Sequence, residues 1–314
     1  MITLGLTLGD PRGIGPEIVG RALGDPRIAA MRAAAPGALS QADPAVVWRV
    51  IGPSGTGVAV HDVLGAWQPT GDAAADESAG GRFAGMAVAQ AARLALSGEL
   101  DGIVTAPLDK HALQAGGYDF PGHTEMLGHL AGVPTAMMLA SDRLRVVLAT
   151  THIALRDVPA ALTRAVLEQT FVTTRDGLQR DLGIGTPRIA LCAMNPHAGD
   201  GGRFGTEDDD LLAPVARACG MAGPFPADTV FVRAMRGEFD AVIAPYHDVG
   251  MTAIKVASFG SAVNITLGLP FVRTSPDHGT ALDIAGRGIA SAESLVQAMG
   301  VAVEMVRRRR ATAG

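Results

Sequence analysis

The sequence is poor in cysteine and in aromatic side chains, and each deficit excludes a class of protein. Only two of its 314 residues are cysteines, and Phe, Trp and Tyr together make up 4%. Because a chain of this length can bury an aliphatic core without cross-links, two cysteines favour a reducing compartment over a disulfide-stabilised scaffold. The scarcity of aromatic rings argues against single-stranded nucleic-acid binding, which needs exposed rings beside a basic groove.

The chain also lacks an excess of positive charge and lacks long apolar runs. Its formal net charge is -5, and its one basic run is Arg307 to Arg310. No stretch stays apolar for the roughly 20 residues that a membrane span requires, and the first residues contain no basic leader. We therefore expect a soluble, cytoplasmic protein with neither nucleic-acid nor membrane partners.

Short apolar runs do occur, and they alternate with Ala- and Leu-rich helical stretches. This alternation is typical of an α/β fold in which helices cross over between parallel strands. The Ala, Gly and Asp residues from Gly71 to Gly81 predict a surface loop. The predicted strands cover 2–8, 46–52, 101–107, 144–150, 188–194, 239–245 and 264–269, and the predicted helices 83–98, 162–183 and 291–310.

Three histidines, His152, His197 and His247, each follow a predicted strand. Ligands of open α/β sheets gather at the carboxyl ends of parallel strands, so the three imidazoles could converge. Three histidines suit zinc or a similar divalent ion and leave a coordination position for substrate. The alternative is that each histidine only binds a loop carbonyl. Their neighbours in TTHI, NPHAG and YHD could orient the rings.

Two further segments suggest an anion site. In FPGHTE a turn delivers His123 and Thr124 to the start of a helix, where free amide groups favour an anion. An ordinary Thr cap with an exposed His123 is the alternative. Farther along the chain, Lys255 and Arg273 flank an apolar strand that contains Asn264. Cations so placed hold phosphate or carboxylate, or are merely solvated.

No standard dinucleotide turn is present. GDPRGIGPEI has Gly13 and Gly15, but Ile18 breaks the G-x-G-x-x-G spacing. HGTALDIAG, by contrast, resembles the adenosine-binding loop of the β-decarboxylating dehydrogenases, and this resemblance implies cofactor contacts at Gly279, Thr280 and Asp283.

Taken in order, the motifs identify a family. TLGDPRGIGPEI, TAPLDKHAL, FPGHTE, ATTHIALRDV, NPHAGDGGRFGTED, YHD and NITLGLPFVRTSPDHGTALDIAG resemble the corresponding segments of 4-hydroxythreonine-4-phosphate dehydrogenases over nearly the whole chain. The resemblance implies a two-domain α/β/α subunit of the isocitrate and isopropylmalate dehydrogenase type, with the active-site cleft between domains. The implied domains are 1–135 with 265–314, and 136–264. It also implies a homodimer with a shared active site, in which one metal ligand comes from the partner.

The implied reaction is oxidation of the secondary alcohol of 4-phosphooxy-L-threonine by NAD or NADP, followed by decarboxylation to 3-amino-2-oxopropyl phosphate. Residue by residue, the resemblance makes the three histidines ligands of one Zn, Mg or Co ion, and Asp248 and Lys255 are candidates for proton transfer. The implied substrate-binding residues are His123, Thr124, Lys255, Asn264 and Arg273.

One departure from the family pattern concerns the substrate. The family has YHDQG and a Pro before the Lys, whereas this chain reads YHDVGMTAIK, with Val249 in place of Gln and Thr252-Ala253 in the Pro region. A relative that oxidises threonate or erythronate 4-phosphate, and a non-catalytic metal- or phosphate-binding relative, therefore remain alternatives. FPGHTE is intact, which favours a phosphorylated substrate over a cyclic dihydrodiol.

Overall fold

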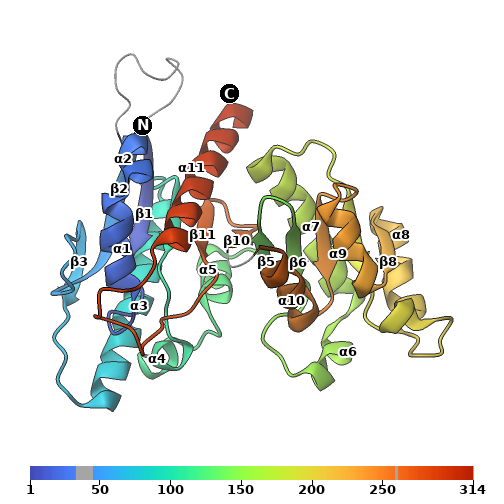
Figure 1. Ribbon diagram of the computed structural model, residues 1–314, viewed down its shortest axis with the longest axis horizontal. Helices are drawn as coiled ribbons and strands as arrows, with labels where there is room; N and C mark the ends of the chain where they lie inside the picture. Colours follow the sequence, from blue (N-terminus) through green and yellow to red (C-terminus); the bar gives the residue numbers. More distant parts are fainter. Residues whose placement is uncertain (33–44, 259–260, 314) are drawn as a thin grey trace. The chain divides into compact units, whose positions relative to one another are not determined.

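A computed structural model describes residues 1–32, 45–258 and 261–313, and within it the chain divides into two compact units. Unit 1 consists of Met1–Val133 and Leu269–Gly314, and unit 2 of Pro134–Gly268. Each unit is built of β-strands with helices packed on them (Figure 1). The predicted α/β class is confirmed.

Unit 1 has a parallel sheet in the order β3-β2-β1-β4-β11. β4 and β11 are buried along their whole length, as strands covered on both faces by helices must be. α3 packs on β2 and β1, while α11 packs on β11 and β4. The elements of unit 1 are β1 (Ile2–Thr7), α1 (Gly15–Gly24), α2 (Pro26–Arg32), β2 (Val46–Ser54), β3 (Asp62–Ala66), α3 (Ala73–Leu96), β4 (Gly102–Thr105), α4 (Lys110–Ala115), α5 (His123–Ala131), β11 (Val272–Pro276) and α11 (Glu293–Ala313).

Unit 2 has a sheet in the order β10-β5-β6-β9-β7-β8. α9 and α10 cover the apolar cluster of one face, and α7 packs on β10, β5 and β6. The elements of unit 2 are β5 (Ala136–Ala140), β6 (Arg145–Leu148), α6 (Val158–Ala161), α7 (Arg164–Leu182), β7 (Ile189–Cys192), α8 (Ala213–Cys219), β8 (Ala222–Phe225), α9 (Ala227–Met235), β9 (Ala241–Ala244), α10 (His247–Ser258) and β10 (Val263–Leu267), with 3-10 turns at Leu155–Asp157 and Pro196–Gly199 and a π-helical turn at Asp208–Leu212.

One strand departs from the predicted parallel arrangement. β5 runs antiparallel to both of its neighbours, β6 and β10. A short turn joins β5 to β6, closed by a 2.9 Å hydrogen bond from Ser141 N to Leu144 O. Only antiparallel strands can be joined by so short a connection.

The predicted surface loop from Gly71 to Gly81 is wrong from Ala73 on, because α3 begins there. Asp72 caps the helix by accepting hydrogen bonds from Ala74 N (3.0 Å) and Ala75 N (2.9 Å). A Cβ on Gly81 would lie 1.6 Å from the carbonyl oxygen of Ala112. The glycines that suggested a loop therefore let α4 approach α3 closely.

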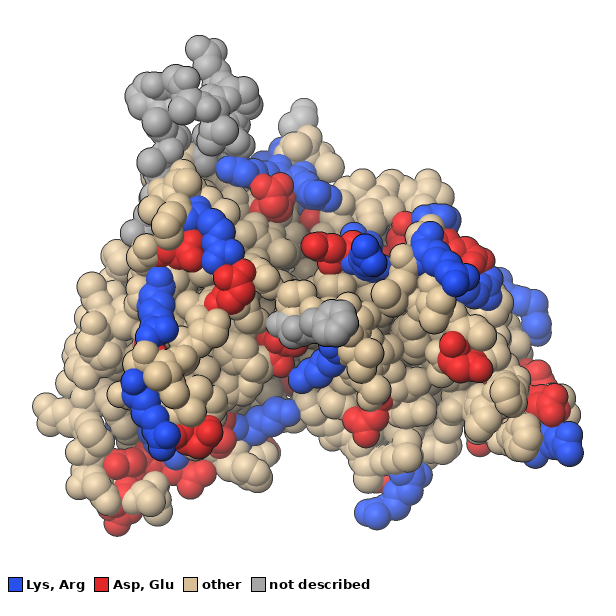
Figure 2. Space-filling model, viewed as in Figure 1, with Lys and Arg blue, Asp and Glu red and all other residues tan. Residues whose placement is uncertain are grey.

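Positive and negative side chains lie next to one another on the face shown in Figure 2. The basic end of α11 takes part in this pairing, since Arg310 Nη2 lies 2.6 Å from Asp101 Oδ1. Arg309 Nη1 donates a 2.9 Å hydrogen bond to Pro270 O. These contacts hold the end of α11 against its own unit. No described helix is long and apolar enough to cross a membrane.

Candidate functional site

The three predicted histidines follow three adjacent parallel strands of unit 2. His152 comes after β6, His247 after β9 and His197 after β7. β9 pairs with β6 on one side and with β7 on the other, both in parallel. The carboxyl ends of these strands therefore lie at one edge of the sheet, where α/β proteins collect ligands.

His152 and His247 form a pair. Their ring centroids are 5.5 Å apart, and both rings line a small cavity of about 120 Å³. Nδ1 of His247 lies 2.7 Å from Oδ1 of Asp248. A carboxylate that accepts the Nδ1 proton leaves Nε2 with a free electron pair, which is how metal-binding imidazoles are usually oriented. The pair thus has the chemistry of two metal ligands.

His197 lies apart from this pair, on the wall of a second cavity of about 310 Å³. Tyr246 lines both cavities. Within residues 1–32, 45–258 and 261–313, no group of three or more His, Cys, Asp or Glu side chains lies close enough to hold a metal ion. The structure therefore brings together two of the three predicted ligands, and the three-ligand site stays a prediction.

In unit 1 the predicted anion site is the start of α5. Gly122 precedes the helix, and a Cβ at that position would lie 4.0 Å from Cε of Lys110. Thr124 is buried in the first turn. His123 is half-buried rather than exposed, and its Nε2 is buried without a hydrogen bond to any described residue.

Two cations, Arg273 and Lys110, and one carboxylate, Glu125, surround this cluster. Burial, reinforced by the charges of Arg273 and Lys110, lowers the pKa of His123 well below its ordinary value. The imidazole is therefore neutral at pH 7 and can still donate one hydrogen bond. An orphaned imidazole nitrogen, two cations and a helix N-terminus fit an oxyanion such as phosphate.

Arg273 reaches this cluster from β11, where it is 1% exposed. Its Nη2 donates a 2.8 Å hydrogen bond to Thr105 Oγ1 on the neighbouring strand β4. Burial lowers the pKa of Arg273 to about 10, and the charge of Glu125 opposes that shift. The guanidinium stays charged at neutral pH, so an anion bound beside it would offset its cost of burial.

The other two predicted substrate residues belong to unit 2. Lys255 is exposed on α10. Asn264 lies on β10, and its Oδ1 is buried without a hydrogen-bond partner among the described residues. A buried amide oxygen without a donor is an acceptor available to a ligand.

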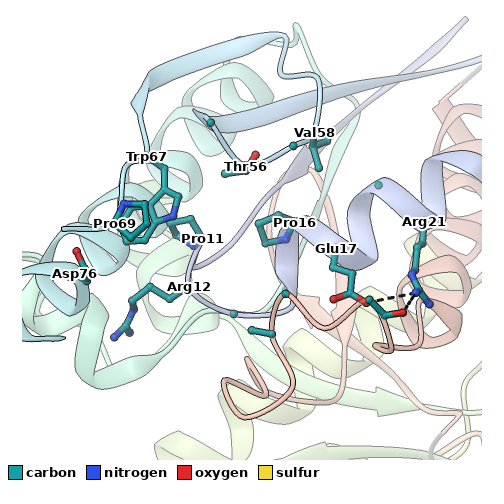
Figure 3. A pocket seen from close by; sticks show the side chains of 17 residues that line it. Pro11, Arg12, Pro16, Glu17, Arg21, Thr56, Val58, Trp67, Pro69 and Asp76 are labelled. Carbon is teal, nitrogen blue, oxygen red and sulfur yellow. Dashed lines mark hydrogen bonds and ion pairs between the residues drawn. The ribbon is translucent and has the colours of Figure 1, made fainter. Parts of the chain in front are cut away.

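The largest of these cavities, about 760 Å³, belongs to unit 1 (Figure 3). Pro11 and Pro69 lie beside the indole of Trp67 at one end, and Glu17 and Arg21 of α1 lie at the other. Oε2 of Glu17 and Oγ1 of Thr56 are buried without hydrogen bonds to described residues. An aromatic ring, small residues and orphaned oxygens suit the base and ribose of a nucleotide.

Gly279, Thr280 and Asp283, the predicted cofactor residues, are not among the described residues that line this cavity, although their segment reaches it. This part of the wall is formed by Ala285 and Gly286, the last two residues of HGTALDIAG, and by Gly288. Thr280 is buried, and its carbonyl accepts a 2.9 Å hydrogen bond from Ile14 N. This bond fixes the segment against the GDPRGIGPEI turn.

Sequence reasoning missed several residues of these sites. Lys110 and Thr105 stand in TAPLDKHAL, a motif that had been assigned no role of its own. Tyr246 stands beside His247 and could have been found from that position. Trp67 and Glu17 lie far apart in the sequence, and nothing in their surroundings predicts that they line one cavity.

Paired imidazoles at strand ends, a buried cationic cluster and a nucleotide-sized cavity on an α/β scaffold fit a dehydrogenase that acts on an anionic substrate. Residues 23–302 match the family described as pyridoxal phosphate biosynthetic protein PdxA. The chain belongs to this family, which confirms the predicted membership and the predicted dehydrogenase class.

Named relatives carry two substrate names. The chain is 43% identical to 4-hydroxythreonine-4-phosphate dehydrogenase of Paracoccus denitrificans, over 97% of this chain and 98% of that one. It is 40% identical to D-threonate 4-phosphate dehydrogenase of Cupriavidus necator, over 98% of each chain. A solved structure of 4-hydroxythreonine-4-phosphate dehydrogenase from Klebsiella pneumoniae matches with a TM-score of 0.78 and 34% identity, over 98% of this chain and all of that one.

Proposed function

We propose that the chain oxidises the secondary alcohol of 4-phosphooxy-L-threonine with NAD or NADP and then releases carbon dioxide, yielding 3-amino-2-oxopropyl phosphate. NAD or NADP would supply the acceptor for the hydride of the alcohol carbon, and the hydroxyl proton would pass to a base. The resulting β-keto acid would lose carbon dioxide, and the carbon that carried the carboxylate would take up a proton. The observation that carries the proposal is the orphaned, buried Nε2 of His123 beside two cations at the start of α5.

In this proposal the phosphate is bound by unit 1. His123 donates from its neutral imidazole, Thr124 donates its hydroxyl, and Arg273 and Lys110 supply charge. The helix N-terminus adds backbone amides. Because Arg273 is held by Thr105 on a central strand, it is already positioned when the substrate arrives.

The histidines of unit 2 would hold a divalent metal ion. Asp248 would accept a hydrogen bond from Nδ1 of His247, which would leave Nε2 free to bind the ion. Such an ion would supply positive charge that favours loss of the hydroxyl proton and stabilises negative charge during decarboxylation. Lys255 lies on α10, the helix that begins with His247, and is the candidate for proton transfer.

A second copy of the chain would complete the metal site. The His152 and His247 pair supports this, because the described residues of one chain offer no third ligand to it. The family resemblance implies the same arrangement. We therefore propose a homodimer in which each active site is shared.

The nicotinamide cofactor would bind in the cavity of Figure 3. Trp67 would contact the adenine, and the buried oxygens of Glu17 and Thr56 would bind ribose hydroxyls. Ala285 and Gly286 present backbone without bulky side chains, which allows a nucleotide to approach closely.

A second candidate substrate is D-threonate 4-phosphate, which carries a hydroxyl in place of the amino group. It is favoured by the relative from Cupriavidus necator and by Val249. Val249 packs against the apolar cluster of unit 2, where the family pattern has an amide. A valine there cannot hydrogen-bond an amino group.

The test is cofactor reduction at 340 nm with purified protein, NAD or NADP, and Mg²⁺, Zn²⁺ or Co²⁺. The substrates are the two phosphate esters and their unphosphorylated alcohols, and carbon dioxide is measured in parallel. We expect reduction and carbon dioxide release with a phosphate ester. Turnover of an unphosphorylated alcohol at the same efficiency would contradict the phosphate assignment.

A further inference from the structure

The loop that carries His197 has an unusual backbone. His197, Ala198 and Asp200 have φ angles of 55°, 56° and 46°, and Gly199 between them has 83°. For residues with a side chain, the left-handed region costs roughly 1 to 2 kcal/mol each. Such a run persists only where surrounding contacts determine it.

Asp208 supplies those contacts at the base of the loop. It is 1% exposed, and its Oδ1 accepts a 2.8 Å hydrogen bond from Met194 N. Its Oδ2 accepts two more, each 3.0 Å long, from Asn195 N and Asn195 Nδ2. Glu207 Oε2 accepts from the same Nδ2 at 2.8 Å. Asn195, two residues before His197, is thus fixed by both its main chain and its side chain.

The loop closes on itself above Asp208. Phe204 N donates a 3.0 Å hydrogen bond to Gly199 O, and the ring of Phe204 lies 6.4 Å from that of His197. A Cβ on Gly199 would come within 2.9 Å of Gly205 O. The two ends of the loop are therefore held together, and the direction of His197 follows from how Asp208 anchors its start.

An ionised carboxylate suits this position better than an amide. Asp208 accepts three N–H bonds and uses both of its oxygens. An Asn side chain has one oxygen, and its NH₂ group would face a backbone donor. Replacing Asp208 by Asn should therefore loosen the loop while changing the shape of the side chain very little.

We propose that Asp208 is a positioning residue that holds the strained loop in place, so that His197 is oriented for a divalent metal ion before the ion binds. The inference rests on the metal role proposed above for His197. Without the anchor, part of the binding free energy would be spent on ordering the loop, and metal affinity would fall.

The experiment compares Asp208→Asn with Asp181→Asn. Asp181 is a fully buried acid on α7 of the same unit, bonded to Arg180. Both variants should lower Tm of the metal-free protein. Only Asp208→Asn should raise the Kd for Co²⁺, measured by its visible absorption, by about 10 to 100-fold. High Co²⁺ should restore kcat.

Two further variants keep the test decisive. Adding Ala198→Gly to Asp208→Asn relieves left-handed strain and should recover part of the Co²⁺ affinity. If Asp208→Asn does not fold, Glu207→Ala removes one acceptor of Asn195 Nδ2, and we expect a loss of about two- to tenfold in affinity.

Equal Co²⁺ affinity in wild type and folded Asp208→Asn would overturn the proposal, as would an equal loss in Asp181→Asn. If Asp208→Asn does not fold, unchanged affinity in Glu207→Ala would overturn it. His197→Ala separates this result from failure of the metal site itself. If His197→Ala binds Co²⁺ as wild type does, His197 is not a ligand and the proposed metal site fails.

Discussion

Arg273 Nη2 donates a 2.8 Å hydrogen bond to Thr105 Oγ1, although the two residues are 168 positions apart in the chain. β11 and β4 are neighbours in the sheet, and their pairing makes this contact possible. A guanidinium is thereby kept in the interior of unit 1, where burial lowers the pKa of Arg273 to about 10. An anion bound at the site proposed above would offset this cost.

Arg273→Met should abolish efficient use of the phosphate ester while leaving the protein folded. Loss of a charge-assisted hydrogen bond, about 1.5 to 3 kcal/mol, corresponds to roughly 10 to 100-fold in kcat/KM. Methionine fills similar space, and replacing a buried charge with an apolar group often maintains stability. Steady-state kinetics measure the effect, and Arg93→Met, at an exposed position of α3, is the control. A loss of equal size for the unphosphorylated alcohol would point to misfolding instead.

Thr105→Val should destabilise unit 1, because it removes the acceptor of the Arg273 bond from a buried position. The expected decrease in the free energy of unfolding is about 1 to 3 kcal/mol, measured by urea denaturation. Thr105→Ser retains the hydroxyl and serves as the matched control. Equal stability of the valine and serine variants would show that the bond contributes nothing to folding.

His123→Gln should change the pH dependence of stability. The unfolded histidine takes up a proton near pH 6.5, whereas the lowered pKa keeps folded His123 neutral to lower pH. Its contribution is therefore complete above about pH 6.5 and decreases as the pH falls towards the folded pKa, by up to about 1.4 kcal/mol per pH unit. We expect the free energy of unfolding of wild type to fall more steeply than that of His123→Gln between pH 7 and pH 5. Parallel curves in that range would contradict the lowered pKa.

Asp248→Ala should weaken metal binding by about 10 to 100-fold, because it removes the carboxylate that orients His247. Isothermal titration with Zn²⁺ measures the affinity directly. Asp142→Ala, in the exposed turn between β5 and β6, is the control. If Asp248→Ala lost activity but kept full metal affinity, Asp248 would act in proton transfer instead.

Trp67 should report cofactor binding. NADH in the cavity of Figure 3 would quench the emission of Trp67 and receive its energy. Trp67→Phe should remove most of this quenching. The Trp48→Phe variant, which changes a buried side chain of β2, should still show it. Quenching that depended on Trp48 would place the nucleotide elsewhere.

The strands that carry the histidines could be predicted because each is a short apolar run that ends at a polar turn. β11 could not, since Arg273, Thr274 and Ser275 are polar and yet fully or nearly fully buried. A run of this kind looks like a charged turn until its neighbours in the sheet are known. β5 was not among the predicted strands, and its antiparallel direction depends on long-range pairing that periodicity does not reveal.

In the candidate site, too, the sequence predicted positions along the chain but not pairing in the sheet. The sequence correctly placed His152, His197 and His247 after strand ends. The order β6-β9-β7, which brings His152 next to His247, depends on long-range pairing. The left-handed backbone of Ala198 has no sequence signal, because alanine is not a residue that favours it. The bonds to Asp208 from Met194 and Asn195, which precede this run, form only in the folded loop.

Unit 1 is built from both ends of the chain, and this has a consequence for synthesis. Unit 2 is contiguous, so a ribosome releases all of its strands before Leu269 emerges. Unit 1 cannot complete its fold until β11 and α11 have been synthesised. Until then, the edge of β4 that pairs with β11 has no partner strand. Arg273 arrives on that late strand. The nascent chain therefore gains Arg273 only after all of unit 2 has been synthesised.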